Sequence, residues 1–299
     1  MKRALVLSGG GSHGAFEVGA LNYLLQEKNM DFHIFRGSSV GALNASVLAQ
    51  AGNYDELLLY LQKLNELWSG IKSNRDIYDG MPVILRLLLS GSLYRPRGLA
   101  RLINHNIDPA KLFSSNRLLM VATVAGEDGE LRYADNRNPA YLENFPDYIL
   151  ASASIPIFFP PVVIQGKHWF DGGLRDVTPL SNIFDEKPDE IVIIVTYPLT
   201  DHLTPAYDAS TVKNSFSILK RAISITLREI CANDIQLAFN INDKLACYQG
   251  KQAVPITLIY PRNHCALDSL DFNSAGIKQL IRSGYECARD ILARPVHKQ

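Results

Sequence analysis

Residues 3–14 read Arg-Ala-Leu-Val-Leu-Ser-Gly-Gly-Gly-Ser-His-Gly, a short apolar run that leads directly into a glycine loop. The run Arg3–Ser8 is predicted to be a buried strand, and the periodicity of Ala15–Glu27 is that of a helix. A strand, a tight loop and a helix in this order form the first unit of an α/β protein. Later segments repeat the order, so this stretch decides the fold class.

The alternation of strand and helix continues along the chain. Phe32–Arg36 is predicted to be a strand and Val40–Ala51 a helix, while Leu118–Ala125 and Glu130–Ala134 are predicted to form a hairpin. Two β-branched strands, typical of parallel sheets, and two helices complete the pattern: Ile191–Thr196, Pro255–Tyr260, Ser210–Cys231 and Ser274–Ala293. We expect one three-layer α/β/α domain over residues 1–299, with a mostly parallel central sheet and a helical cap inserted at about residues 54–111.

The composition excludes several classes of protein. The 299 residues include 30 Lys plus Arg and 30 Asp plus Glu, which gives a formal net charge of +0, and 47% of the residues are apolar. A chain this apolar is not intrinsically disordered, and its balanced charge gives no support to nucleic-acid binding. No apolar run approaches the roughly 18 residues of a membrane-spanning helix.

The N-terminus and the cysteines bear on location and metal binding. Only Ala4–Leu7 separates Met1-Lys2-Arg3 from the glycine loop, so the pattern of a signal peptide is lacking. We therefore predict a cytoplasmic protein or an already processed chain. The four cysteines have no short metal-ligand spacing: they are Cys231, Cys247, Cys265 and Cys287. Free thiols, no metal and no cofactor are the expectation.

The glycine loop fits two kinds of anion site. Gly9, Gly11 and Gly14 match G-x-G-x-x-G between a strand and a helix, the pattern that binds dinucleotide pyrophosphates. The same backbone N–H groups can hold the oxyanion of an acyl-transfer intermediate. A nucleotide site needs an acid at the end of the second strand, where this chain has Arg36-Gly37. The oxyanion site is favoured, and nucleotide binding through Gly9–Gly14 stays the alternative.

The second turn carries a candidate nucleophile. Gly37-Ser38-Ser39-Val40-Gly41 is a G-x-S-x-G sequence between a predicted strand and a predicted helix, which is the context of a nucleophile elbow. The glycines at Gly37 and Gly41 permit a sharp turn that projects the central hydroxyl. Ser39 is therefore the candidate nucleophile, and a helix-capping serine is the structural alternative.

A serine nucleophile needs a base, and the sequence offers two kinds. Asp171 lies in Trp169-Phe170-Asp171-Gly172-Gly173, after a short apolar strand and before two glycines that suit a tight turn. His202 and His264 follow later strands and fit the chain order of a Ser-His-Asp esterase. A lipid acyl hydrolase using Asp171 and an esterase using a histidine are thus both open.

Together these motifs resemble the patatin-like phospholipases, in particular their bacterial branch. That family has a glycine-rich loop near the N-terminus, a G-x-S-x-G elbow and a later D-G-G or D-G-A aspartate. The matching segments are Gly9–Gly14, Gly37–Gly41 and Asp171–Gly173. A fourth, Ala151–Pro161, is similar to the family's A-S-x-A-x-P-x-x-F-P-P stretch. The four lie in the family's order within roughly the first 180 residues, and one position differs: His13 stands where the family usually has Arg or Lys.

The resemblance implies a patatin-like fold and the hydrolysis of lipid carboxylic esters, such as phospholipids, lysophospholipids or acylglycerols. It implies a Ser39–Asp171 catalytic dyad, without a metal. It also implies an oxyanion hole made of the backbone amides of Gly10, Gly11 and Ser12. Gly9, His13, Gly14, Gly37, Gly41, Gly172 and Gly173 would support these groups.

The cap segment suggests how the protein meets its substrate. From Pro82 to Arg117 there are six basic residues against one acid, Asp108, among many leucines: Arg86, Arg95, Arg97, Arg101, Lys111 and Arg117. Such a pattern suits peripheral contact with an anionic membrane surface. It equally suits a helical cap whose leucines face the core and whose arginines are solvated, an alternative that we favour slightly.

Overall fold

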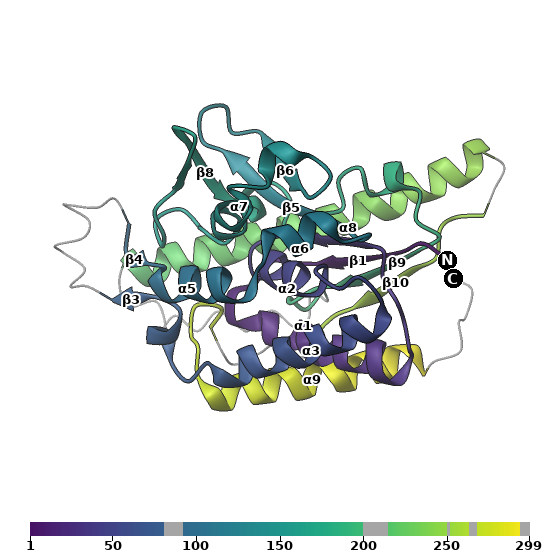
Figure 1. Ribbon diagram of the computed structural model, residues 1–299, viewed down its shortest axis with the longest axis horizontal. Coiled ribbons are helices and arrows are strands. Elements are labelled where there is room, and N and C mark those ends of the chain that lie inside the picture. The colour runs from purple at the N-terminus through teal and green to yellow at the C-terminus, as the bar shows by residue number, and fades with distance from the viewer. Residues whose placement is uncertain (81–91, 200–214, 250–251, 263–267, 294–299) are drawn as a thin grey trace.

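A central sheet organises the molecule (Figure 1). The structure is a computed structural model that describes residues 1–80, 92–199, 215–249, 252–262 and 268–293. In these ranges the sheet has eight strands in the order β10-β9-β1-β2-β5-β8-β7, with β6 also paired to β5. Their bounds are β1 Arg3–Leu7, β2 Ile34–Gly37, β5 Leu118–Ala125, β6 Leu131–Asp135, β7 Val162–Ile164, β8 Lys167–Asp171, β9 Glu190–Ile194 and β10 Ile256–Ile259.

The sheet is mostly parallel, as predicted. The strands β10, β9, β1, β2 and β5 run parallel to one another. At one side of the sheet, β6 and β8 pair with β5 in antiparallel, and β7 pairs with β8 in the same way. β1 shows why both faces must be covered. Leu5 and Leu7 belong to one hydrophobic cluster, whereas Ala4 and Val6 belong to another, and all four side chains are fully buried. A strand buried on both faces reads as a continuous apolar run.

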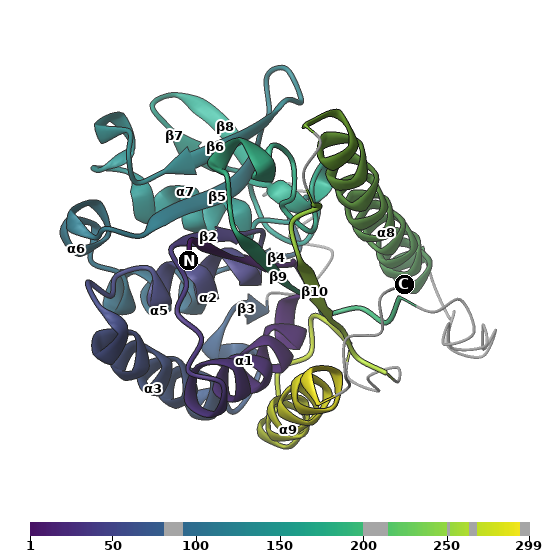
Figure 2. The ribbon, with the colours of Figure 1, turned by 90° about the vertical axis from the view of Figure 1, so that its right-hand side faces the viewer.

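Helices cover the two faces of the sheet, which confirms the three-layer α/β/α fold. Figure 2 shows α1, α3 and α9 on one side of β1, β9 and β10, and α8 on the other. Residues of α1, α2 and α9 enter the cluster with Leu5, whereas Cys231, Ile235 and Ala238 of α8 enter the cluster with Ala4. The bounds are α1 Gly14–Asn22, α2 Val40–Leu48, α3 Tyr54–Gly70, α8 Ser215–Gln249 and α9 Ser274–Leu292. No helix of the described residues is both long and apolar enough to span a membrane.

Some element boundaries differ from the sequence-based expectation. The helix predicted to end at Cys231 continues to Gln249, because buried positions recur at Ile235, Ala238 and Asn242 along one side. Helix α7 (Phe145–Ser152) was not predicted, since it is short and begins with a proline in its first turn. The helix over Ala15–Glu27 ends in a π-helical turn at Tyr23–Glu27.

The segment at residues 54–111 is largely helical in its described part. It contains α3, α5 (Arg97–Asn106) and the start of α6 (Pro109–Ser114), together with the two-stranded pair of β3 (Asp79–Gly80) and β4 (Tyr94–Arg95). Leu99 and Ile103 of α5 are buried, while Arg97 and Arg101 are exposed. The apolar side of α5 therefore faces inward. Arg86 and residues 210–214 of the predicted helix lie outside the described residues.

Two glycines set the distance between α1 and α9. A Cβ at Gly19 would lie 1.8 Å from the carbonyl oxygen of Ile281, and one at Gly284 would lie 1.9 Å from that of Phe16. The two backbones are thus in direct contact. Because α1 begins at the glycine loop, this packing fixes the helix that carries the loop.

We predict that Gly284→Ala lowers the free energy of unfolding by about 1–3 kcal/mol, since the added methyl group forces the two helices apart. Gly70→Ala is the matched control, because a Cβ at that helical position meets no atom within 4 Å. The control should leave stability unchanged or raise it slightly. Urea unfolding measures both, and equal losses in the two variants would contradict the packing argument.

Candidate active site

Ser39 lies at a sharp turn between β2 and α2. Its φ is 53° and its ψ is −125°, a backbone conformation that a residue with a side chain rarely adopts. A Cβ at Gly37 would lie 2.4 Å from the carbonyl oxygen of Gly41, and a Cβ at Gly41 would lie 2.3 Å from that of Leu7. The turn therefore requires both glycines, and the strained residue between them has the geometry of a nucleophile elbow.

The pairing of β5 brings Asp171 to the same place. The first half of β5 pairs with β2 in parallel, and Gly37 lies opposite Val121. The second half of β5 pairs with β8 in antiparallel, and Asp171 lies opposite Thr123. Because β6 occupies the other edge of β5, β2 and β8 share one edge and their C-terminal ends point toward each other. Ser39 and Asp171 come from these two ends.

The Asp171 carboxyl group is buried and only partly hydrogen-bonded. Its side chain accepts a hydrogen bond at Oδ1 from the Gly173 N–H at 2.7 Å, and the residue is 2% exposed. Among the described residues, no donor with good hydrogen-bond geometry faces Oδ2. Burial raises the pKa of Asp171 to about 7, although the Gly173 N–H and the Ser39 hydroxyl act as donors that lower it. The Ser39 hydroxyl thus lies close to the carboxyl group without a well-aligned bond, as is common before substrate binds.

The glycine loop lies directly against the elbow. A Cβ at Gly9 would be 3.2 Å from that of Ser39, and the Gly9 N–H donates to the carbonyl oxygen of Val177 at 2.9 Å. Within the described part of the chain, the N–H groups of Gly10 and Gly11 have no acceptor. The Ser12 N–H, in contrast, donates to the carbonyl oxygen of Ser269 at 2.8 Å. Two of the three predicted oxyanion donors are therefore open, and the third is engaged.

Close packing explains the remaining glycines. A Cβ at Gly10 would collide with Thr196 Oγ1 at 2.1 Å, and one at Gly172 with the carbonyl oxygen of Ala122 at 2.4 Å. Gly11 has a φ of +58°, Gly14 faces Val40, and a Cβ at Gly173 would be 3.0 Å from Asp171 Oδ1. His13 ends the turn Gly11–His13, and its ring contacts that of Tyr197 at a centroid distance of 6.3 Å.

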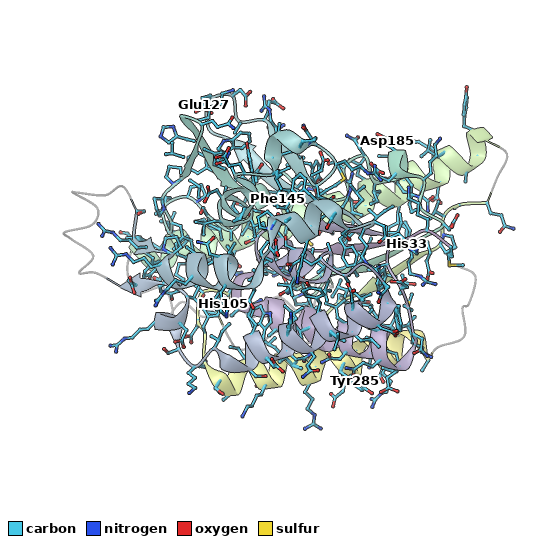
Figure 3. The ribbon with its side chains drawn as sticks, in the orientation of Figure 1. His33, His105, Glu127, Phe145, Asp185 and Tyr285 are labelled. Atoms are coloured by element: carbon cyan, nitrogen blue, oxygen red, sulfur yellow. The ribbon has the colours of Figure 1, made fainter. Side chains whose placement is uncertain are left out.

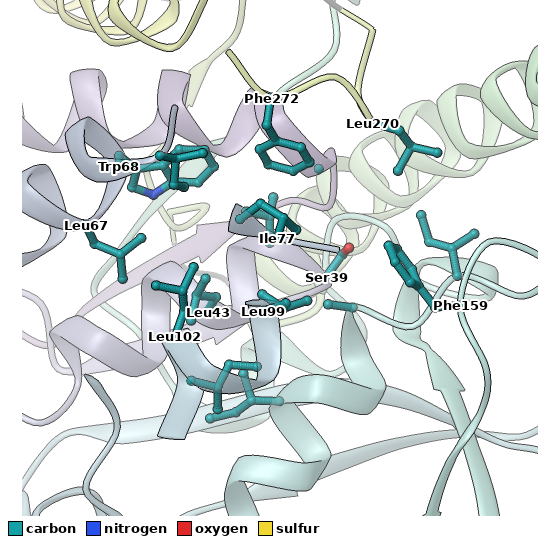
Figure 4. A pocket seen from close by; sticks show the side chains of 17 residues that line it. Ser39, Leu43, Leu67, Trp68, Ile77, Leu99, Leu102, Phe159, Leu270 and Phe272 are labelled. Carbon is teal, nitrogen blue, oxygen red and sulfur yellow. The ribbon is translucent and has the colours of Figure 1, made fainter. Parts of the chain in front are cut away.

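An apolar pocket opens at Ser39 (Figure 4). It encloses about 630 Å³ of empty space, including its open mouth, and Ser39 supplies the hydroxyl group in its lining. Figure 4 shows Trp68 and Leu67 on one side of Ser39 and Phe159 and Leu270 on the other. The walls come from α2, α3, α5 and α7 and from residues 270–272. An apolar lining with one hydroxyl group suits the hydrocarbon part of a ligand, with a polar group placed at Ser39.

Sequence reasoning missed one residue that contacts the elbow. Ser152, at the end of α7, accepts a hydrogen bond at its Oγ from the Ser39 N–H at 2.9 Å. The signal was its place in the segment Ala151–Pro161, which the resemblance singled out without giving a role to this serine.

The rival sites are only partly described. His202 and His264 lie outside the described residues. Figure 3 shows His33 and His105 well apart, and both are exposed. His33 precedes β2, at the end of that strand away from Ser39. The glycine loop that a nucleotide would use faces Ser39, and Gly11 lines the same pocket. In the described ranges, no group of three or more His, Cys, Asp or Glu side chains is placed to hold a metal ion.

Known proteins resemble this chain in sequence and in structure. The sequence model of the family described as patatin-like phospholipase matches residues 5–183. "Uncharacterized protein YjjU" of Escherichia coli (strain K12) is 27% identical over 212 residues, which cover 68% of this chain and 54% of that protein. The chain thus spans about half the length of this curated relative. The crystal structure of VipD from Legionella pneumophila aligns over 97% of this chain and 66% of that chain, with 13% identity and a TM-score of 0.49.

The raised pKa of Asp171 predicts how stability depends on pH. The folded protein holds this proton up to about pH 7, whereas the unfolded chain releases it near pH 4. The stabilising contribution is therefore complete below about pH 4 and is lost as pH rises through 7. Relative to Asp171→Asn, the wild type should lose stability over this window by up to about 1.4 kcal/mol per pH unit.

Urea unfolding of both proteins between pH 4 and pH 9 measures this difference. Ser39→Ala, which keeps the carboxyl group, should retain the pH dependence. A stability difference between wild type and Asp171→Asn that does not change with pH would show that the buried carboxyl group titrates at its ordinary value.

Proposed function

The chain belongs to the patatin-like phospholipase family, and from this premise we propose that it is a serine acyl hydrolase that cleaves carboxylic esters of lipids. The observation that carries the proposal is the apolar pocket that opens at Ser39, beside the buried carboxyl group of Asp171. The pocket suits an acyl chain, and the two polar groups lie where its ester carbonyl would be.

The proposed reaction uses groups already in place. Ser39 Oγ attacks the ester carbonyl carbon, and its proton moves to Asp171 Oδ2 as the C–O bond forms. The N–H groups of Gly10 and Gly11 stabilise the oxyanion, each donor contributing on the order of 3 kcal/mol in such sites. When the intermediate collapses, the leaving alcohol takes the proton from Asp171. Water, deprotonated by Asp171, then attacks the acyl-enzyme. As the bond between the acyl group and Ser39 Oγ breaks, Asp171 returns the proton to Oγ, and the fatty acid and free Ser39 are released.

The burial of Asp171 makes it a suitable base for this chemistry. A carboxyl group at its ordinary pKa of about 4 is too weak to take a serine proton effectively at neutral pH. With a pKa of about 7, Asp171 is partly ionised at neutral pH and a stronger base when ionised. The dyad thereby works without a histidine.

Two alternatives would replace this proposal if the tests required it. A Ser-His-Asp esterase would keep Ser39 and use His264 or His202 as base. In that case activity would survive Asp171→Asn and be lost in His264→Ala or His202→Ala. A nucleotide-binding protein would use Gly9–Gly14, and NAD or ATP would then raise the thermal unfolding temperature.

Contact with an anionic membrane is a further part of the proposal. The structure leaves fewer basic residues for it than the sequence suggested. Arg117 is 4% exposed and its side chain pairs with Asp31 at 2.6 Å, so it does not belong to a basic surface. Arg95, Arg101 and Lys111 are exposed, and the Arg97 side chain is 66% exposed. These four cations, on β4, α5 and α6, would carry the attraction to anionic lipid.

We predict that an ester panel and an active-site probe identify Ser39. A fluorophosphonate probe should label the wild type and leave Ser39→Ala unlabelled. Hydrolysis of nitrophenyl esters of increasing chain length, and of phospholipid vesicles, should fall by at least about a thousandfold in both Ser39→Ala and Asp171→Asn, because either change removes a member of the dyad. Absence of labelling in the folded wild type would contradict both hydrolase mechanisms.

We also predict modest, salt-sensitive binding to anionic liposomes. The variant Arg95→Gln/Arg97→Gln should lose most of this binding, because each basic residue near such a surface contributes about 1 kcal/mol. Arg282→Gln, at an exposed position on α9, is the control and should bind as the wild type does. Sedimentation with vesicles at low and high salt measures the effect. Binding that ignores salt, or no binding at all, would contradict membrane contact through these residues.

A further inference from the structure

The segment that follows α7 touches the backbone of both proposed catalytic residues. Ser152 Oγ accepts the Ser39 N–H at 2.9 Å, and the carbonyl oxygen of Ser154 accepts the Asp171 N–H at 3.2 Å. Both serines are fully buried. One piece of chain, three residues long, therefore bridges two residues that lie far apart in the sequence.

The same segment has a second side. Ala153 and Ile155 line the apolar pocket, together with Phe159 a little further along. The Ser152 hydroxyl and the Ser154 backbone carbonyl thus contact the backbones of Ser39 and Asp171. The alternating residues, 153 and 155, face the pocket proposed for the acyl chain. An acyl chain bound in the pocket would therefore contact the segment that is hydrogen-bonded to Ser39 and Asp171.

The hydrogen bond from Ser39 to Ser152 is made at a demanding position. Ser39 has a positive φ, so its backbone needs support from its surroundings to stay in that conformation. Its N–H is buried, and a buried donor without a partner is costly. The Ser152 hydroxyl satisfies this donor, whereas Asp171 is held by a backbone carbonyl that no side-chain substitution removes.

We propose that Ser152 is a positioning residue for the nucleophile, which holds the Ser39 backbone through its hydroxyl group so that Oγ faces the substrate carbonyl and Asp171. This inference rests on the proposed function. It assigns to Ser152 an effect on the rate of acyl transfer, and none on the binding of the acyl chain, because Ser152 does not line the pocket.

Ser152→Ala tests the proposal, with Ser154→Ala as the matched control. The two serines are two residues apart and equally buried, but the Ser154 hydroxyl donates to the Leu150 carbonyl of α7, at 2.8 Å, and not to the backbone of Ser39 or Asp171. We expect kcat on a nitrophenyl ester to fall about tenfold to a hundredfold in Ser152→Ala, with KM within about twofold of wild type. The rate of fluorophosphonate labelling should fall in parallel, and Ser154→Ala should keep both rates within about threefold.

A third variant separates hydrogen bonding from packing. Cysteine keeps an atom at the γ position and is somewhat larger than serine, but its sulfur is a weak acceptor. Ser152→Cys should therefore lose activity as Ser152→Ala does, although it leaves no cavity, and it serves as the test should the alanine variant fail to fold. Thermal unfolding of each variant establishes that the comparison is made on folded protein.

The outcomes distinguish this inference from the proposed function. Wild-type rates in folded Ser152→Ala or Ser152→Cys would overturn the positioning role, as would equal losses in Ser152→Ala and Ser154→Ala. Ester hydrolysis that persists in Ser39→Ala would instead overturn the proposed function, whatever the Ser152 variants do.

Discussion

The edge of β5 shared by β2 and β8 is the constraint on which the rest of the site depends. Backbone hydrogen bonds fix β2 along the first half of this edge and β8 along the second, with opposite directions. Two strand ends thus point at one another across a short gap. A turn at the end of β2 then presents Ser39, and the last residue of β8 is Asp171. A Cβ on either elbow glycine, or on the loop glycines Gly10, Gly11 and Gly14, would collide with a neighbouring atom.

The site contains two features that cost free energy of folding, and packing elsewhere in the three layers offsets this cost. Ser39 has a strained backbone, and the carboxyl group of Asp171 is buried. Each lowers stability, and each follows from a placement between the sheet and the covering helices. The close contact of α1 with α9 and the buried apolar residues of both sheet faces offset these costs. The same burial that opposes ionisation of Asp171 gives the group a pKa suited to proton transfer near neutral pH.

The sequence predicted the local motifs of the site better than the contacts between segments that lie far apart along the chain. Adjacent residues specify both the first strand and the turn around Ser39. The strand predicted over Arg3–Ser8 is found at Arg3–Leu7, and Ser39 lies at a sharp turn between a strand and a helix. The bond from Ser39 to Ser152 joins distant segments, and no periodicity reveals it. Arg117 was counted among the basic residues of the cap segment, because its partner Asp31 precedes it by 86 residues and no local pattern reveals the pair. Pairs of residues this far apart in the sequence can be recognised only in the folded structure.

The proposed catalytic groups and the pocket differ in where they lie along the chain. Ser39, Asp171 and the glycine loop all fall within the family match at residues 5–183, whereas Leu270 and Phe272 of the pocket wall lie beyond it. Two hydrogen bonds join this later segment to the rest of the site: the Tyr78 side-chain hydroxyl donates to the Leu270 carbonyl at 2.6 Å, and the Ser12 N–H donates to the Ser269 carbonyl at 2.8 Å. The residues of the proposed reaction thus lie in the region that the family model matches, while the shape of the pocket also depends on residues that the model does not cover. Differences in acyl-chain preference between relatives should arise in this later segment and in the helices α3 and α5.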